Sequence, residues 1–411
     1  MRSTSTRRTD LPSYRELLAT PDLRALLLAT LLARLAGRMF ALTIVLYALL
    51  HTGSPVLAGW LAFAAIAPGL AVSPLAGAFI DRAGSIAAIS ADMAASAACI
   101  LALIALDRLG RAHAPALLIL TGLYSLTSPL SMAGIRALLP RLVPPATRDR
   151  ANALDTAIHG LTDVVGPATA GLLVGFVGPG TALGAIAASF AAAAFCLRGV
   201  RQRHGADVAG GPLLRQAWRG VFLVLRRRTL RGLAVAYSLY EISWGVLVVA
   251  VPVSLAQRYA GGTGAAATGV LWAGLGLVGA FAALTAGHRR IAGRERGVIA
   301  LGMLATAVAL WPLGACFGVI GLALALMLVG AAAGPIDVSV LTLRQRRTDP
   351  RELGRVLSVS MSLNMSGGPL GSALAGTLVT WSLPATFALA ATASVLAAMA
   401  VALIPARDDR G

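Results

Sequence analysis

Long apolar stretches alternate with short polar breaks along the whole chain. Each stretch is close to the roughly 20 residues that an α-helix needs to cross the core of a bilayer. Twelve such stretches follow one another, over residues 24–50, 56–80, 86–106, 116–139, 151–177, 181–197, 230–255, 265–286, 298–313, 316–343, 354–380 and 384–404. The pattern predicts an all-α polytopic membrane protein with twelve transmembrane helices.

The composition agrees with this pattern. Hydrophobic residues make up 57% of the 411 residues, charged residues only 13%, and the mean hydropathy is +0.78. Soluble domains average roughly 45–50% apolar and about 25% charged residues. A soluble core does not account for so apolar a chain, so the lipid bilayer is its expected environment.

The basic residues test the order of the spans. All 35 are arginines, and arginines collect in the cytoplasmic loops of membrane proteins. If the N-terminus is cytoplasmic, 30 arginines lie on the cytoplasmic side, two lie inside the first span, and three lie outside, namely Arg108, Arg111 and Arg258. This asymmetry predicts that both termini are cytoplasmic, because removing one helix would invert every later loop.

The same distribution explains the formal net charge of +18. A strongly basic domain often binds nucleic acid, but here the arginines are spread over all the loops of one membrane side. Contact with anionic lipid accounts for them. No nucleic-acid partner is therefore expected.

The longest polar break divides the chain into two halves of six predicted helices. We expect a cytoplasmic tail over residues 1–23, a first bundle over 24–197, a cytoplasmic linker over 198–229, a second bundle over 230–404 and a short tail over 405–411. Apolar residues recur at helical spacing within the linker, which indicates a helix lying on the membrane surface.

The two halves share a Gly-Pro pair in their fifth helix. Gly166-Pro167 and Gly368-Pro369 are 202 residues apart, and an arginine-rich loop precedes each. Transporters built from structural repeats show such internal symmetry. Proline removes a backbone hydrogen bond and bends a helix, while small residues such as Gly166 and Gly171 permit close helix contact. A bend and simple packing both remain open as roles for these residues.

Two further stretches resemble a known family. The segment GAFIDRAGS, residues 77–85, lies in the predicted turn between the second and third spans and resembles the G-x-x-x-D-R-x-G-R signature of the major facilitator superfamily (MFS). The segments PRLVPPATRDRANALD and VVGPATAGLLVG resemble the fourth and fifth spans of its twelve-span efflux branch, which includes macrolide and siderophore exporters. Ser85 replaces a basic residue of the signature, and Thr162 stands where the antiporter form of the fifth span often has glycine.

The resemblance implies the MFS fold, in which two pseudo-symmetric six-helix bundles surround a central cavity. It also implies that the signature is a cytoplasmic latch, made in one state of the transport cycle and broken in the other. Its residues here are Gly77, Asp81, Arg82 and Gly84. An ordinary Asp-Arg-x-Gly turn without a gating role is the alternative.

Three ionisable residues interrupt the fifth apolar stretch. Asp155, His159 and Asp163 follow one another at intervals of four residues, so on a helix they form one polar stripe that climbs roughly 12 Å. Asp163 is expected roughly 18 Å from the cytoplasmic end of the helix, near the bilayer centre. A charge at that depth costs about 2.5–3.5 kcal/mol on insertion scales, so it should face protein or water and have a partner.

The first span offers the partner. Arg34 and Arg38 are four residues apart, hence on one helix face, and their expected depths approach those of His159 and Asp163. If the first and fifth spans are neighbours, as the resemblance implies, Arg38 and Asp163 form a buried ion pair. The favoured interpretation is that an acid of this group takes up and releases a proton during transport. A purely structural pair is the alternative, and a metal site of His159 with the two aspartates matches no strong motif.

The seventh and tenth spans carry two more acids. Glu241 lies in AYSLYEISWG beside Tyr237, Tyr240 and Trp244, and Asp337 follows a Gly-Pro pair in GPIDVSV. The resemblance places both spans on the central cavity, where an acid among aromatic rings suits a bulky cationic or amphipathic substrate. Anchoring of the rings at the membrane interface and a local helix kink at Asp337 are the alternatives.

These observations favour a secondary transporter. The chain shows no phosphate-binding loop, zinc helix motif or G-x-S-x-G elbow, so neither ATP hydrolysis nor enzymatic chemistry is expected. An ion gradient, most simply of protons, remains as the energy source, with no cofactor. We expect a monomer in the cytoplasmic membrane of a bacterium that exports a small molecule by proton antiport. Proton-coupled uptake is the alternative, and a transport-inactive sensor or a membrane enzyme is a remote one.

Overall fold

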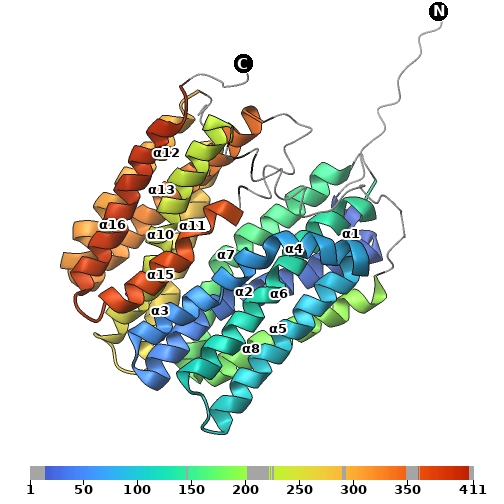
Figure 1. Ribbon diagram of the computed structural model, residues 1–411, viewed down its shortest axis with the longest axis horizontal. Helices are drawn as coiled ribbons and strands as arrows, with labels where there is room; N and C mark the ends of the chain where they lie inside the picture. Colours follow the sequence, from blue (N-terminus) through green and yellow to red (C-terminus); the bar gives the residue numbers. More distant parts are fainter. Residues whose placement is uncertain are drawn as a thin grey trace, which may run out of the picture.

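The computed structural model of the chain consists of helices joined by turns (Figure 1). It describes residues 14–144, 147–200, 222, 224, 226–288, 293–348, 360 and 362–406. The longer helices are α2 (Pro21–Thr52), α3 (Pro55–Ala64), α4 (Ala67–Ala83), α5 (Ser85–Arg108), α6 (Ala114–Leu142), α7 (Arg148–Val177), α8 (Pro179–Cys196), α10 (Arg228–Ala256), α11 (Gly262–His288), α12 (Glu295–Val308), α13 (Gly318–Arg346), α15 (Gly367–Leu378) and α16 (Leu383–Ala400). Short helical turns adjoin them, namely α1 (Tyr14–Ala19), η2 (Leu197–Gly199), η3 (Ala309–Gly314) and η4 (Val401–Leu403).

Ten helical segments within the described residues are long and apolar enough to cross a membrane. They follow ten of the predicted spans. The span predicted over 298–313 corresponds to α12 with η3, and the described part of the span predicted over 354–380 includes α15. The all-α architecture is confirmed for the described residues, whereas the total of twelve spans and the membrane side of the termini stay predictions.

One predicted span is broken in the structure. The pattern predicts a single helix over residues 56–80, but α3 ends at Ala64 and α4 begins at Ala67. Pro68 explains the break, because proline has no N–H for the carbonyl one turn back and its ring collides with that turn. The predicted hairpin at Gly178 is present, and its φ of +88° is a conformation that favours glycine.

The helices form two groups that follow the order of the chain (Figure 1). In the first half, α2 packs against α7 and α8, α5 against α6 and α8, and α4 against α6. In the second half, α11 packs against α13, α10 against α15 and α16, and α12 against α13 and α16. The predicted bounds of the two bundles stay a prediction, and most of the predicted linker, including residues 201–221, lies outside the described residues.

Glycines bring the two groups together at the end of the molecule remote from both termini (Figure 1). Here α7 crosses α11, and α3 crosses α15. A Cβ at Gly171 would lie 2.5 Å from the backbone nitrogen of Gly269, and one at Gly59 would lie 2.8 Å from the Cα of Gly376. The helix backbones touch directly, so this end of the molecule is closed.

We expect Gly171→Ala to open this closure. The new Cβ would lie 2.8 Å from the carbonyl oxygen of Ala265, and backbone cannot move aside unless α7 and α11 separate. The measurement uses a cysteine introduced at Ala168, with the three native cysteines replaced by serine. In the Gly171→Ala variant this cysteine should react with a membrane-impermeant maleimide roughly tenfold faster than it does when Gly171 is present. Gly160→Ala on the same helix is the matched control, because its Cβ meets no atom within 4 Å. Equal labelling rates in the two variants would show that the glycine contact does not close the molecule.

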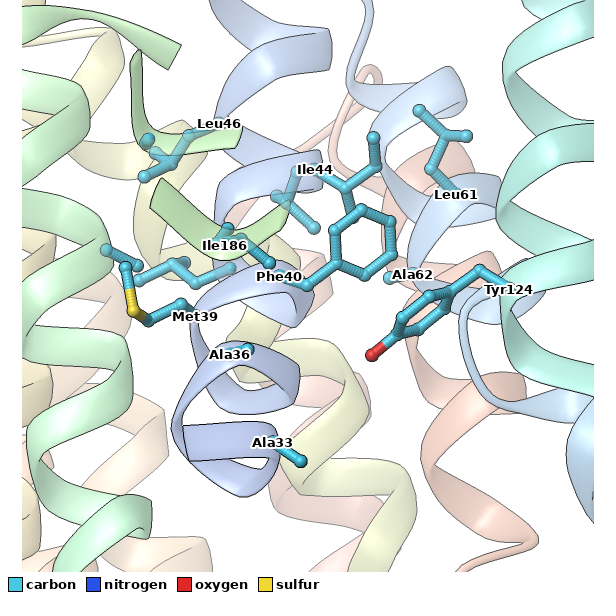
Figure 2. Packing of buried hydrophobic residues seen from close by; sticks show 14 of the residues in the cluster. Ala33, Ala36, Met39, Phe40, Ile44, Leu46, Leu61, Ala62, Tyr124 and Ile186 are labelled. Atoms are coloured by element: carbon cyan, nitrogen blue, oxygen red, sulfur yellow. The ribbon is translucent and has the colours of Figure 1, made fainter. Parts of the chain in front are cut away.

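Tight packing fixes the orientation of α2, the helix that carries Arg38. Figure 2 shows Phe40 of α2 against Tyr124 of α6, and their ring centroids are 4.3 Å apart. Met39 and Ile186 of α8 lie in the same buried cluster. Because interiors are packed nearly as densely as organic crystals, α2 cannot rotate freely about its axis. The polar residues on its other side are therefore held toward α7.

Candidate functional site

The predicted polar stripe of α7 meets the arginines of α2. Arg38 Nε lies 2.6 Å from Asp163 Oδ1, and His159 Nε2 lies 3.8 Å from Asp163 Oδ2. The side chains of Arg38 and Asp163 are 41% and 42% exposed, so solvent or a ligand can reach them. The predicted ion pair is present, and its role in proton coupling stays a prediction.

A second ion pair joins the same two helices one turn earlier on α2. Arg34 Nη1 lies 2.9 Å from Asp155 Oδ1 and also donates to the backbone carbonyl of Asp155, while Nη2 donates to Oδ2 at 3.2 Å. These side chains are 22% and 20% exposed, about half as much as Arg38 and Asp163. The bidentate contact and lower exposure are typical of a structural brace. Arg136 of α6 is close enough for its charge to act on both residues, and no sequence motif marks it.

The Gly-Pro pair of α7 shapes the Arg38 site. α7 continues through Pro167, so the pair does not end the helix. Pro167 has no N–H, which in an α-helix leaves the carbonyl of Asp163 without its usual partner. A Cβ at Gly166 would overlap the Cβ of Arg38. Gly166 therefore allows the backbone of Arg38 to approach α7 closely enough for the ion pair.

The second half of the chain contributes two acids. Tyr237 Oη donates a 2.6 Å hydrogen bond to Asp337 Oδ1, which joins α10 to α13. Glu241 lies one turn beyond Tyr237, and a Cβ at Gly368 of α15 would be 3.5 Å from its Oε2. Among the described residues, neither Glu241 nor Asp337 forms an ion pair. Their carboxylates therefore remain available to an external cation.

A row of aromatic rings borders these acids. Neighbouring centroids are 6.0 Å apart for Tyr237 and Tyr240, 6.4 Å for Tyr240 and Trp244, and 6.1 Å for Trp244 and Trp272. Tyr240 is 1% exposed and its hydroxyl lies 3.2 Å from Thr306 Oγ1. It was expected to contact substrate, but its ring is buried and packs against the other rings of the row. Trp272 of α11 extends the row, and its Nε1 has no hydrogen-bond partner among the described residues.

The charged residues of the two halves act on one another. The charge of Arg38 attracts Glu241, and that of Asp163 repels Asp337. Direct contact between α2, which carries Arg38, and α10, which carries Glu241, brings the two halves together. We call Arg38, Asp163, Glu241 and Asp337 the central charge cluster. Four helices that are far apart in sequence contribute to it.

The internal repeat relates the two sides of the central charge cluster. Glu241 follows Arg38 by 203 residues, and Gly368 follows Gly166 by 202. In each half the glycine lies beside the charged residue, Gly166 beside Arg38 and Gly368 beside Glu241. The repeat therefore presents a cation in the first half and an anion at the matching position of the second.

The second Gly-Pro pair lies at a helix start. α15 begins at Gly367, so Pro369 is in the first turn, where the missing N–H would have no partner within the helix. A Cβ at Gly245 of α10 would overlap the carbonyl oxygen of Gly368. Here the pair allows a close crossing of α10 and α15, whereas bending of a continuous helix was the expectation.

The predicted latch residues lie where α4 turns into α5. Gly84 has a φ of +84°, and α5 begins at the next residue. Arg82 is exposed in the last turn of α4, and Gly77 lies within the same helix. The side chain of Asp81 lies outside the described residues. The latch function of these four residues stays a prediction.

Arginines at the end of α13 tie the second half together. Arg346 Nη1 lies 2.6 Å from Glu295 Oε1 at the start of α12, and Arg347 donates to Thr229 Oγ1 and to the carbonyl of Pro405. Burial raises the pKa of the Glu295 carboxyl, but backbone hydrogen bonds and the Arg346 guanidinium outweigh it, so the pKa lies below its ordinary value. Glu295 therefore stays ionised at neutral pH. It serves the packing of these helix ends, away from the central charge cluster.

Comparison with known proteins identifies the family. The family model described as Major Facilitator Superfamily matches residues 26–291 and 233–411. The chain belongs to the major facilitator superfamily. The resemblance in the sequence is thereby confirmed, and the protein is a membrane transporter by family and not an enzyme.

Two relatives extend along most of this MFS chain. An uncharacterised MFS-type transporter, y4rN, of Sinorhizobium fredii (strain NBRC 101917 / NGR234) is 54% identical over 393 residues, which cover 96% of this chain and 97% of that protein. The multidrug efflux pump Tap of Mycolicibacterium fortuitum is 28% identical over 377 residues, covering 86% of this chain and 88% of Tap.

Solved structures confirm the MFS fold. A mutant of the nucleoside transporter NupG superposes with a TM-score of 0.73 at 14% identity, covering 93% of this chain and 100% of that one. A bacterial homologue of the iron transporter ferroportin in an inward-facing state gives 0.71 at 19% identity, with 95% and 99% covered. At these identities the likeness concerns the fold alone.

Proposed function

We propose that this MFS protein exports a cationic, aromatic or amphipathic small molecule across the cytoplasmic membrane in exchange for protons. The observation that carries the proposal is the central charge cluster. One acid of the cluster, Asp163, is paired with an accessible arginine, and two others, Glu241 and Asp337, have no ion-pair partner among the described residues. Such a cluster offers separate places for a proton and for a cation.

The proton side of the proposal rests on Asp163. Ionisable residues inside membrane spans are costly to keep and mark ion or proton pathways. Asp163 is 42% exposed and has both Arg38 and His159 within 4 Å. Arg38 contacts the carboxylate, and the exposed part of the Asp163 side chain lets water bring a proton to it. We therefore assign Asp163 as the proton-carrying group, with Arg38 and His159 as its immediate neighbours.

The cation side rests on the wall formed by α10 and α13. Glu241 and Asp337 supply negative charge, and Tyr237 and Trp244 supply aromatic faces beside it. A cation near an aromatic face gains about 0.5–2 kcal/mol, more when water is excluded. The wall therefore suits a positively charged molecule with apolar rings better than a sugar or an anion.

The proposed direction of transport rests on a relative. The relative Tap is by name a multidrug efflux pump. With the termini cytoplasmic, as the arginine distribution predicts, the closed end of the molecule faces outward and the central charge cluster is reached from the cytoplasm. An exporter loads its substrate in that state, and an uptake transporter releases its substrate there, so the choice of export rests on the likeness to Tap.

The proposal is tested with the full-length protein in liposomes that carry a pH-sensitive dye. Ethidium, a permanent aromatic cation, is added on the side that corresponds to the cytoplasm while an opposing proton gradient is imposed. We expect ethidium to dissipate the pH gradient faster than in protein-free vesicles, and ethidium to move against the proton flow. Movement of both in the same direction would instead establish proton-coupled uptake, and no ethidium-dependent proton flow would remove the cation-antiport proposal.

A further inference from the structure

We infer that Arg38 is shared between Asp163 and Glu241, so that protonation of Asp163 transfers the guanidinium to Glu241 and expels a bound cation. This inference rests on the proposed function and names the physical link between its proton and substrate sites. It concerns one side chain that lies between two acids from opposite halves.

The geometry makes Arg38 available to both acids. Its Nε holds Asp163 Oδ1 at 2.6 Å, while 41% of the side chain remains exposed and its charge already acts on Glu241. α2 and α10, which carry Arg38 and Glu241, are in contact. An arginine has five N–H donors on a long, flexible arm, so it can change partners by rotation of its side chain.

The surrounding contacts fix the base of the arm and leave its tip free. The backbone of Arg38 packs closely against Gly166, which has no Cβ. Its neighbours Met39 and Phe40 are buried, which also fixes the backbone. By contrast, Arg34 donates to a carboxylate and to a carbonyl at once and is only 22% exposed. Arg34 is therefore locked in place, and Arg38 is the mobile member of the two.

The exchange proceeds in three balanced steps. In the structure, Asp163 holds Arg38 in the ion pair, so Glu241 is free to bind a cation. A proton then adds to a carboxylate oxygen of Asp163, which removes its charge and breaks the ion pair. The released guanidinium pairs with Glu241 and replaces the bound cation, and loss of the proton from Asp163 restores the first state.

This exchange accounts for coupling without a direct contact between proton and substrate. Two sites are coupled when each ligand favours a different state of a shared element, and the coupling is the same in both directions. Here the shared element is the Arg38 side chain with its two partners. Bound cation keeps Glu241 occupied and Arg38 on Asp163, so it should also retain the ionised form of Asp163.

A stability cycle on the substrate-free protein tests the sharing of Arg38. In the wild type, Glu241→Gln removes an unpaired acid and should not lower the melting temperature. In Asp163→Asn, where Arg38 has lost its first partner, Glu241→Gln should lower it by about 2 °C or more. Adding Arg38→Gln should abolish this difference, whereas Arg34→Gln should preserve it. Additive effects of Asp163→Asn and Glu241→Gln would overturn the inference, whatever the substrate.

A binding measurement gives a second arm in case a multiple variant does not fold. At pH 7.5, Asp163→Asn should weaken ethidium binding about tenfold, because the free Arg38 competes for Glu241. The double variant Asp163→Asn with Arg38→Gln should return to within about threefold of the wild type. Weakened binding without this rescue would overturn the inference. If the wild type binds no ethidium but the stability cycle shows coupling, the proposed substrate class fails and the shared arginine stands.

Discussion

Asp163→Asn is expected to reduce proton-driven ethidium export in proteoliposomes about 100-fold. Asparagine has nearly the shape of aspartate, but it can neither bind nor release a proton, so the proton gradient no longer drives the cycle. The ion pair with Arg38 at 2.6 Å is lost at the same time. Initial rates of ethidium movement under an imposed pH gradient measure the effect.

Two comparisons separate loss of coupling from loss of folding. Exchange of labelled for unlabelled ethidium at saturating concentration needs no proton, so Asp163→Asn should retain it. Asp155→Asn makes the same substitution eight residues earlier on α7, in the less exposed pair with Arg34. We expect Asp155→Asn to lower the melting temperature and to keep the pH dependence of transport. Normal pH dependence in Asp163→Asn would exclude Asp163 from the proton path.

The sequence predicts the Arg38–Asp163 pair for a simple reason. Charges inside an apolar helix are rare and costly, so each requires a partner at the same depth. The first span carries two arginines deep within its apolar stretch, and counting 1.5 Å per residue places Arg38 near the depth of Asp163. In a membrane protein the sequence thus predicts the depth of each charged residue in the bilayer, whereas the sequence of a soluble protein gives no such position.

Other features depend on side-chain packing and leave no such trace. Helical spacing places Tyr240 near Glu241, but it does not show that the Tyr240 side chain is buried with its hydroxyl against Thr306. Trp272 joins the aromatic row through the approach of α11 to α10, and nothing within its own stretch marks it. The break before Pro68 was also missed, because hydropathy alone does not register one lost hydrogen bond in a long apolar stretch.

The match between the two repeats lies between these cases. The sequence shows two Gly-Pro pairs 202 residues apart. It does not show that Gly166 lies against Arg38 while Gly368 lies against Glu241, because that requires the contacts of α2 with α7 and of α10 with α15. Once these contacts are known, a cation and an anion occupy matching positions. Because Arg38 and Glu241 carry opposite charges at the same position of the repeat, the two halves can attract each other through these two residues alone.

Glu241→Gln is expected to weaken ethidium binding about 10- to 100-fold while leaving binding of a neutral aromatic compound of similar size within about threefold. The amide keeps the shape of the side chain and its place beside Gly368, but it removes the charge that attracts the cation. The aromatic row remains, so the apolar part of the affinity should persist. Fluorescence titration of the purified protein at pH 7.5 measures both ligands.

Glu295→Gln is the matched control for this prediction. It makes the same chemical change in a glutamate that is ionised at neutral pH but lies at the start of α12, paired with Arg346 at 2.6 Å. Losing that pair should reduce stability slightly, since Arg346 is 55% exposed, and should leave ethidium affinity unchanged. Equal loss of affinity in both variants would indicate a general effect of net charge. A loss confined to Glu241→Gln would place the cation on the α10 wall, where Arg38 can displace it.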